Sequence, residues 1–170
     1  MLKIKSFIFN PYQENTYLIF DDSKEAIVVD PGNYEAQENE LVSKFIDENK
    51  LILKKIILTH CHLDHCLGNK YLNEKYGAEL LIPFDERDIY KNVENIATLF
   101  GFSNYSHLDA NKYLKEKDKI EFGNIKLDVL FLPGHSPGHL AFYCKNENVC
   151  FSGDVLFYNS IGRTDLPGGD

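Results

Sequence analysis

The stretch THCHLDH, residues 59–65, places three histidines and one aspartate within seven residues. The whole chain of 170 residues has six histidines, so half of them lie in this window. The stretch directly follows the apolar run IIL at residues 56–58, which predicts the end of a buried strand. Imidazole nitrogens and carboxylate oxygens are ligands that Zn²⁺ and Fe²⁺ accept, so the sequence predicts a metal site that begins here.

The spacing within this stretch supports the metal-site interpretation. His60 and His62 are two residues apart, so they point to the same side in an extended segment. Asp64 and His65 follow after a turn. A polar surface loop would account for one histidine, but it does not account for three histidines beside an aspartate.

Two later segments repeat the pattern of a metal-type side chain at the end of an apolar strand. PGHSPGH at residues 133–139 presents His135, and SGD at residues 152–154 presents Asp154. Three strand ends of this kind form a constellation that is stronger evidence than any one of them alone. We therefore predict that His135 and Asp154 complete the site.

The chain is expected to be a single domain, residues 1–170, of the α+β class. Strands come in two batches with helices between them, which favours a layered sandwich over an alternating parallel sheet. We predict helices over residues 35–49, 67–76 and 84–101, and we leave 103–119 without regular structure. The predicted strands are 4–9, 16–20, 26–29, 51–58, 78–82, 119–122, 125–132, 140–144 and 149–152.

The charge of the chain indicates which kinds of binding partner are not expected. The formal net charge is −8, from 26 acidic and 18 basic side chains, and no basic run interrupts it. Nucleic acid and anionic membranes are therefore not expected as partners. Residues 1–10 alternate apolar and polar side chains as a strand does, unlike a signal peptide, and no apolar run approaches the ~18 residues of a membrane span. We expect a cytoplasmic protein whose four cysteines are free thiols.

Taken together, these motifs resemble those of the metallo-β-lactamase-fold hydrolases. The similarity is greatest to the single-domain proteins related to glyoxalase II (hydroxyacylglutathione hydrolase), and it covers essentially the whole chain. It implies an αββα four-layer sandwich with a two-metal site at its edge. The segments that carry it are HxHxDH at 60–65, PGHSPGH at 133–139, SGD at 152–154, SIGRTDLPGGD at 160–170, residues 10–17 and VDPG at 29–32.

The resemblance implies a role for each residue around the first ion. His60, His62 and His135 would bind it, and Asp154 would bridge it to the second ion. Asp30 would support the histidine loop, because a ligating imidazole needs an acceptor for its other N–H group. The resemblance leads us to expect zinc as the metal, although iron or manganese suits the same ligands.

The second ion would be bound by Asp64 and His65 together with Asp154. In the family it has one more histidine, from a PGHG-like segment beyond GRTDLPGGD, whereas this sequence stops at Asp170 directly after that motif. We therefore expect a chain truncated at its C-terminus, without the family's last strand and helix, and an incomplete second site. The uncovered edge would favour a homo-oligomer.

The function implied is hydrolysis of a small-molecule thioester by a metal-activated hydroxide, with Asp64 as a catalytic residue that holds the proton of the nucleophile. Glutathione recognition is not implied, because the added helical domain of full glyoxalase II is absent. Two alternatives stay open. One is a persulfide dioxygenase of the same fold with a single iron on His60, His62, His135 and Asp154. The other is a truncated metal-binding protein with little activity.

Several residues near these motifs are expected to be structural. Arg163 is predicted to pair with Asp165 within its own loop, and His139 to be a hydrogen-bonded structural histidine. Three aromatic residues could line the pocket, but aromatic side chains are more often core, so the core is favoured for them: Tyr12, Phe157 and Tyr158.

Overall fold

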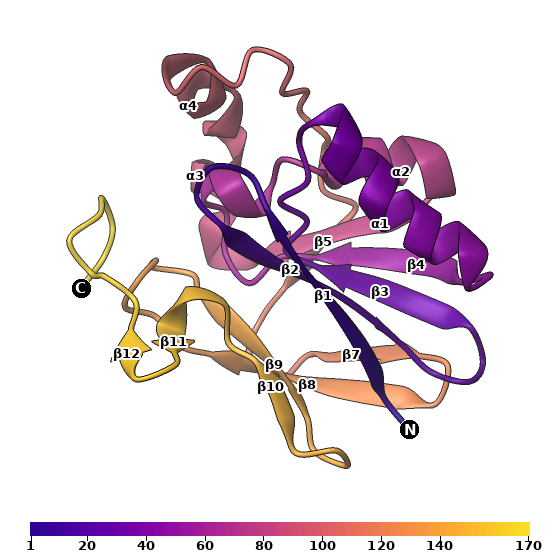
Figure 1. Cartoon of the computed structure of the whole chain (residues 1–170). Helices are drawn as coiled ribbons and strands as arrows, with labels where there is room; N and C mark the ends of the chain where they lie inside the picture. The colour runs from indigo at the N-terminus through magenta and orange to yellow at the C-terminus, as the bar shows by residue number, and fades with distance from the viewer.

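The computed structural model describes all residues, 1–170, as two facing sheets with helices over the outer face of the larger one (Figure 1). A short third sheet follows near the C-terminus. The larger sheet contains β1 (Lys3–Phe9), β2 (Glu14–Phe20), β3 (Glu25–Val29), β4 (Ile52–Ile57), β5 (Glu79–Pro83) and β6 (Lys112–Leu114). The others contain β7 (Lys119–Phe122), β8 (Ile125–Phe131), β9 (Leu140–Cys144), β10 (Val149–Phe151), β11 (Leu156–Phe157) and β12 (Ser160–Ile161).

The larger sheet is mixed, with both antiparallel and parallel strand pairs. Its order is β1-β2-β3-β4-β5-β6, antiparallel from β1 to β3 and parallel from β3 to β6. The parallel part arises because α1 (Ala36–Glu48) and α2 (Asn69–Tyr76) connect successive strands as crossovers. The second sheet is antiparallel, in the order β10-β9-β8-β7. Carboxyl ends of β3 and β4 therefore lie at one edge, where functional sites of such sheets form.

The predicted helix ends agree with the capping residues. A capping box of Glu35 and Glu38 begins α1, which ends at Asn49, and Gly77 ends α2 with a positive φ of 69°. Glycine adopts that conformation without steric cost. The inner face of α1 buries Val42 and Ile46, and full burial of one such side chain stabilises the fold by roughly 1.5–3 kcal/mol.

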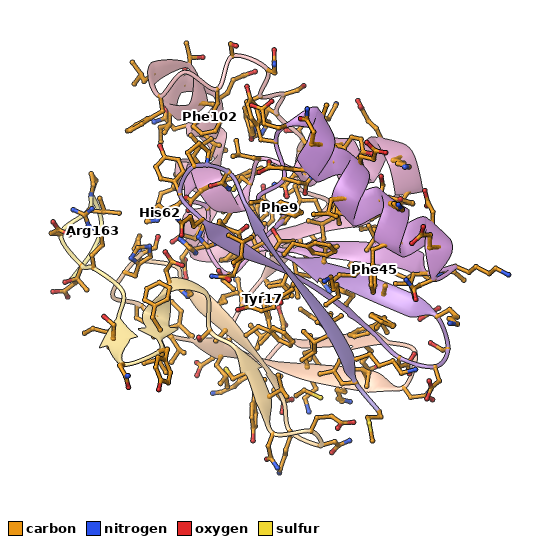
Figure 2. The ribbon with its side chains drawn as sticks, viewed as in Figure 1. Phe9, Tyr17, Phe45, His62, Phe102 and Arg163 are labelled. Atoms are coloured by element: carbon orange, nitrogen blue, oxygen red, sulfur yellow. The ribbon has the colours of Figure 1, made fainter.

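Two apolar cores flank the larger sheet. Val28 and Ile56 face the helices, and Figure 2 shows Phe9 and Phe45 on the same side. Ile27 and its neighbours face the second sheet. Because side chains alternate along a strand and both faces are covered, the inner strands carry apolar side chains on both faces, as in the AIVV run of β3. The loops at the strand ends are thus held by a rigid, doubly packed sheet.

The structure corrects two details of the predicted elements. The expected helix over 84–101 is broken into η2 (Phe84–Glu86), α3 (Arg87–Lys91) and α4 (Val93–Leu99). The segment left irregular, 103–119, contains the three-residue strand β6, too short to give a periodic signal.

The helices lie on one side of the pair of sheets. All four helices, α1 to α4, contribute to the core on the outer side of the larger sheet, and none covers the outer face of the second sheet. The longest helix has 13 residues, and no helix is long and apolar enough to cross a membrane. All four cysteines are free, as predicted.

Candidate metal centre

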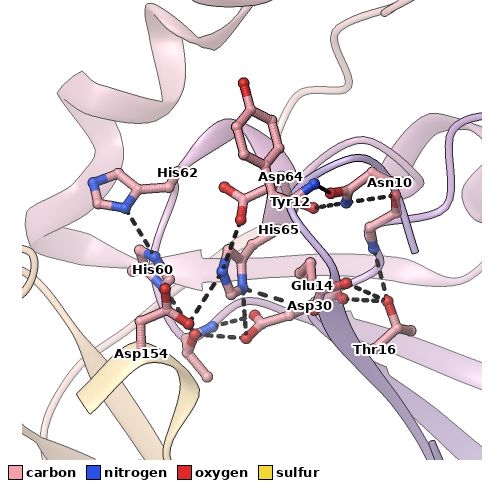
Figure 3. A network of polar contacts seen from close by, with 12 residues as sticks. Asn10, Tyr12, Glu14, Thr16, Asp30, His60, His62, Asp64, His65 and Asp154 are labelled. Atoms are coloured by element: carbon pink, nitrogen blue, oxygen red, sulfur yellow. Dashed lines mark hydrogen bonds and ion pairs between the residues drawn. The ribbon is translucent and has the colours of Figure 1, made fainter. Parts of the chain in front are cut away.

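The predicted site residues meet at one edge of the two sheets. Asp30 directly follows β3, and residues 59–65 follow β4 as a loop that ends in a short turn, η1 (Leu63–His65). The loop between β8 and β9 brings His135, and the turn η3 (Gly153–Val155) after β10 brings Asp154. Figure 3 shows His60, His62, His65 and Asp154 gathered in one polar network.

Three histidines form a first cluster. His62 Nδ1 lies 3.1 Å from His60 Nε2 and 2.9 Å from His135 Nε2. Ligand atoms of the three residues all lie within 4.8 Å of one another. Zinc binds imidazole nitrogen at about 2.0–2.1 Å, so three nitrogens at these separations can surround one ion with little movement. The residues present fit a metal ion.

The far sides of two rings are held by hydrogen bonds. His135 Nδ1 lies 2.8 Å from the carbonyl oxygen of Arg163, and an N–H group there can donate to it. His60 Nδ1 lies 3.0 Å from Thr59 Oγ1, whose hydroxyl donates to Asp30 Oδ2 at 2.6 Å. Protons on these outer nitrogens leave both Nε2 lone pairs free toward the cluster, which is the tautomer that metal binding requires.

A second cluster adjoins the first through one carboxylate. His65 Nε2 lies 3.5 Å from Asp64 Oδ2 and 3.4 Å from Asp154 Oδ1. The other oxygen, Asp154 Oδ2, lies 3.5 Å from His135 Nε2. The two oxygens of Asp154 therefore reach one cluster each, which is the geometry that a bridging carboxylate needs.

Asp30 lies beneath both clusters and is buried. Its Oδ1 accepts the Thr59 N–H at 2.7 Å, and its Oδ2 lies 3.1 Å from His65 Nδ1. Asp30, His60 and His65 are also close enough to hold an ion themselves. We assign Asp30 a supporting role and not a ligand role. Both of its oxygens already accept hydrogen bonds, and His60 directs its Nδ1 to Thr59 and not to Asp30.

A cavity of about 410 Å³ opens beside the second cluster. Asp64, His65 and Asp154 form its polar side. The three aromatic residues for which the core was favoured line this cavity instead, because the β1–β2 turn, β11 and the β11–β12 turn lie at the surface. They are exposed at 51% for Tyr12, 45% for Phe157 and 95% for Tyr158.

The comparisons with known proteins agree with this geometry. Residues 9–170 match the model of the metallo-beta-lactamase superfamily. The chain belongs to the metallo-beta-lactamase superfamily. The predicted family and fold class are thereby confirmed.

Relatives of this superfamily member share most of its length. It is 36% identical over 162 residues to a hydroxyacylglutathione hydrolase, GloC, of Haemophilus influenzae, covering 94% of this chain and 74% of that protein. The crystal structure of the BLEG-1 B3 metallo-beta-lactamase matches with a TM-score of 0.87 and 32% identity, over 99% of this chain and 79% of that one. The di-iron-bound form of TTHA1623 matches with a TM-score of 0.83 and 33% identity, over 98% and 79% of the two chains.

Glu14 is a residue of this centre for which the sequence predicted no role, although it lies in residues 10–17, which carry part of the resemblance. It is buried, and its Oε1 lies 3.9 Å from His65 Nδ1 without a hydrogen-bond partner. Burial raises the pKa of Glu14 to about 9, against the opposing charge of His65. A neutral Glu14 can donate to Thr16 Oγ1, 2.7 Å from its Oε2, and the Thr16 hydroxyl can then donate to the carbonyl oxygen of Asp30 at 2.8 Å.

The histidines of this metallo-beta-lactamase fold carry different charges in the metal-free protein. Burial, reinforced by His135, lowers the pKa of His62 to about 4, and burial also lowers the pKa of His60. Burial would lower the pKa of His65 too, but the charges of Asp64 and Asp30 outweigh it and raise that pKa. His60 and His62 are therefore neutral and ready to bind a cation at pH 7, whereas His65 must release a proton first.

We expect the metal-free protein to be most stable near pH 6.5. Below that pH the unfolded chain protonates His62 and His139, whose folded pKa values are about 4 and about 3, so stability falls as pH drops. Glu14 opposes this trend, because the folded chain holds a proton on its carboxyl group that the unfolded chain releases, but it contributes only one proton. Above pH 6.5 the folded chain keeps protons on His65 and Glu14 that the unfolded chain loses, so stability falls again toward pH 9.

The thermal midpoint of chelator-treated protein, followed by circular dichroism from pH 5 to pH 9, checks this expectation. His139→Gln serves as the matched variant, because its side-chain oxygen can still accept the Asp154 N–H that His139 Nε2 accepts at 3.2 Å. The acidic side of the curve should become shallower in this variant. A midpoint that rises continuously to pH 9 would contradict the assigned protonation states.

Two further sequence predictions agree with the structure. The side chain of Arg163 donates to both oxygens of Asp165, at 2.6 and 2.7 Å, so it pairs within its own loop. His139 is buried, stacks on His60 at 4.6 Å between ring centroids, and accepts the backbone N–H of Asp154. It therefore holds the backbone of Asp154 in place and has its Nε2 already engaged.

Proposed function

We propose that this chain is a metal-dependent hydrolase that cleaves a small-molecule thioester into a carboxylic acid and a thiol. One observation carries the proposal: Asp154 reaches with one oxygen toward His135 in the first histidine cluster and with the other toward His65. When bound, metal ions there would activate water and polarise the thioester carbonyl as Lewis acids. The Haemophilus relative named a hydroxyacylglutathione hydrolase supports the thioester.

The residues of the chain have distinct proposed roles. His60, His62 and His135 hold the first ion, and burial lowers the pKa values of His60 and His62 so that these two stay unprotonated at neutral pH. Asp64 lies beside His65 at the mouth of the cavity and accepts the proton that the attacking water releases. The free thiols of all four cysteines fit a reducing compartment such as the cytoplasm.

The cysteines are not proposed as ligands or nucleophiles. Cys61 is fully buried next to Cys66, and burial raises the pKa of the Cys61 thiol. A protonated thiol is a poor metal ligand and a poor nucleophile.

A second candidate is a dioxygenase with a single iron ion, and one feature favours it. The first cluster has three imidazoles and Asp154, whereas the second has only His65 with two aspartates. One iron on the first cluster alone would leave coordination positions open for oxygen and a persulfide.

Thiol release from S-lactoylglutathione and from an acyl-coenzyme A, with zinc, iron or manganese added to the chelator-treated chain, tests the proposal. We expect release that depends on added metal. Oxygen uptake with glutathione persulfide and iron, without thioester cleavage, would support the dioxygenase. Bound metal without turnover of either substrate type would leave a metal-binding protein and refute both enzymes.

A further inference from the structure

Glu86 is a fully buried carboxylate that the sequence motifs do not include. It lies in η2, between the two loops that carry the first cluster of histidines. Its Oε2 accepts the backbone N–H of Cys61 at 3.1 Å. Its Oε1 accepts the hydroxyl of Ser136 at 2.5 Å and the backbone N–H of Gly138 at 2.7 Å. All three donors are buried with it in the interior.

The positions of these donors decide what Glu86 can do. Cys61 lies between His60 and His62, and Ser136 directly follows His135. The Glu86 carboxylate therefore holds both histidine loops. It binds the backbone between His60 and His62 in one loop and the residue after His135 in the other. Hydrogen bonds to a carboxylate in a buried site are short and strong.

Gly138 shows how closely the second loop approaches Glu86. A Cβ atom at this position would lie 2.8 Å from Glu86 Cγ, Glu86 N and the carbonyl carbon of Asp85. Two of these atoms are backbone, which cannot yield as a flexible side chain can. The approach that brings the loop into hydrogen-bond range of Glu86 therefore requires glycine here.

We propose that Glu86 is a positioning residue that fixes the spacing of His60 and His62 relative to His135 and so sets the affinity of the first metal site. The inference rests on the proposed metal site. It adds to that site a residue that contacts neither metal nor substrate. A ligand set must be held within about 0.5 Å of its working geometry, and the groups that hold it are as necessary as the ligands.

Glu86→Gln separates this role from ordinary packing. The glutamine oxygen can accept either from Ser136 and Gly138 or from Cys61, and the Ser136 hydroxyl can also accept from the NH₂ group. In either orientation the NH₂ group faces one backbone N–H, that of Cys61 or that of Gly138, and two donors repel each other. The substitution keeps the volume of the side chain but disturbs one of the two histidine loops, and so the spacing between them.

Asp21→Asn is the matched control. Asp21 is equally buried and accepts the backbone N–H groups of Ser23 and Asn124 at 3.0 and 2.8 Å. It lies at the β2–β3 turn, at the opposite end of the larger sheet from the metal centre (Figure 1). Both substitutions remove a buried charged acceptor, so both should lower the thermal midpoint, while only Glu86→Gln acts on the histidine loops.

The test is a Co²⁺ titration of the purified chain, followed by visible absorption, with circular dichroism to establish folding. We expect Glu86→Gln to weaken the first Co²⁺ site by about 10- to 100-fold and to alter its spectrum. Asp21→Asn should keep affinity within about twofold and keep the spectrum. A folded Glu86→Gln chain with wild-type affinity and spectrum overturns the inference, whereas a wild-type chain that binds no Co²⁺ overturns the proposed metal site itself.

A milder variant keeps the inference testable if Glu86→Gln does not fold. Ser136→Ala removes one of the three donors and leaves Glu86 charged and bonded to Cys61 and Gly138. We expect about a threefold loss of Co²⁺ affinity from this single hydrogen bond. Unchanged affinity and spectrum in this variant would count against Glu86 as a positioning residue.

Discussion

Replacing His60 and His62 together with alanine removes bound metal from the chain and abolishes thioester cleavage. The expected change is from at least one ion per chain to less than about a tenth, because the two residues supply two of three clustered imidazoles and no remaining side chain can replace both. Elemental analysis of purified protein and thiol release measure the two effects.

The control for this double variant is His107→Ala. His107 lies away from the centre, against Tyr90 with ring centroids 4.8 Å apart, so its loss should leave the metal content unchanged. Circular dichroism should show that the double variant is folded. Metal retained in stoichiometric amount by the folded double variant would refute the site assignment.

Asp30→Asn should weaken metal binding by about 10- to 100-fold and lower turnover at fixed metal concentration in proportion. The asparagine oxygen can accept one of the hydrogen bonds that Asp30 accepts from the N–H and hydroxyl of Thr59. Its NH₂ group must replace either Oδ1, where it faces the Thr59 N–H, or Oδ2, where it faces both that hydroxyl and His65 Nδ1, so the histidine loop or an imidazole loses its support. The backbone tolerates the change, since asparagine adopts the positive φ of 50° found at Asp30.

A graded companion is Thr59→Val, which removes the hydroxyl between Asp30 and His60 but keeps the backbone hydrogen bond to Asp30. It should lose less affinity than Asp30→Asn. Equal metal affinity in the wild type and the Asp30→Asn chain, measured by competition with a chromophoric chelator, would show that Asp30 does not support the ligand loop.

The sequence predicted the elements that carry the centre because their signals are local. The strand IIL, the loop after it and the glycine that ends α2 each follow from a few neighbouring residues. The contributions of His135 and Asp154 also followed from local strand ends. The structure brings both to the histidine loop, and their roles as ligands remain proposals.

The sequence did not assign Glu14 or Glu86 to the centre, and the reason is physical. Each is an acidic residue in a polar stretch, where a solvent-exposed side chain is the usual outcome. Their burial depends on partners far along the chain, such as Ser136, which is 50 residues from Glu86. Such contacts have no periodicity and no motif, so only the folded arrangement reveals them.

The most direct test of the account is X-ray absorption spectroscopy of the chain loaded with one equivalent of Zn²⁺. The account predicts a shell of nitrogen and oxygen at about 2.0–2.1 Å, with the outer-shell scattering of imidazole rings and no sulfur. Failure to retain zinc, or a sulfur shell at about 2.3 Å that identifies Cys61 or Cys66 as a ligand, would contradict it.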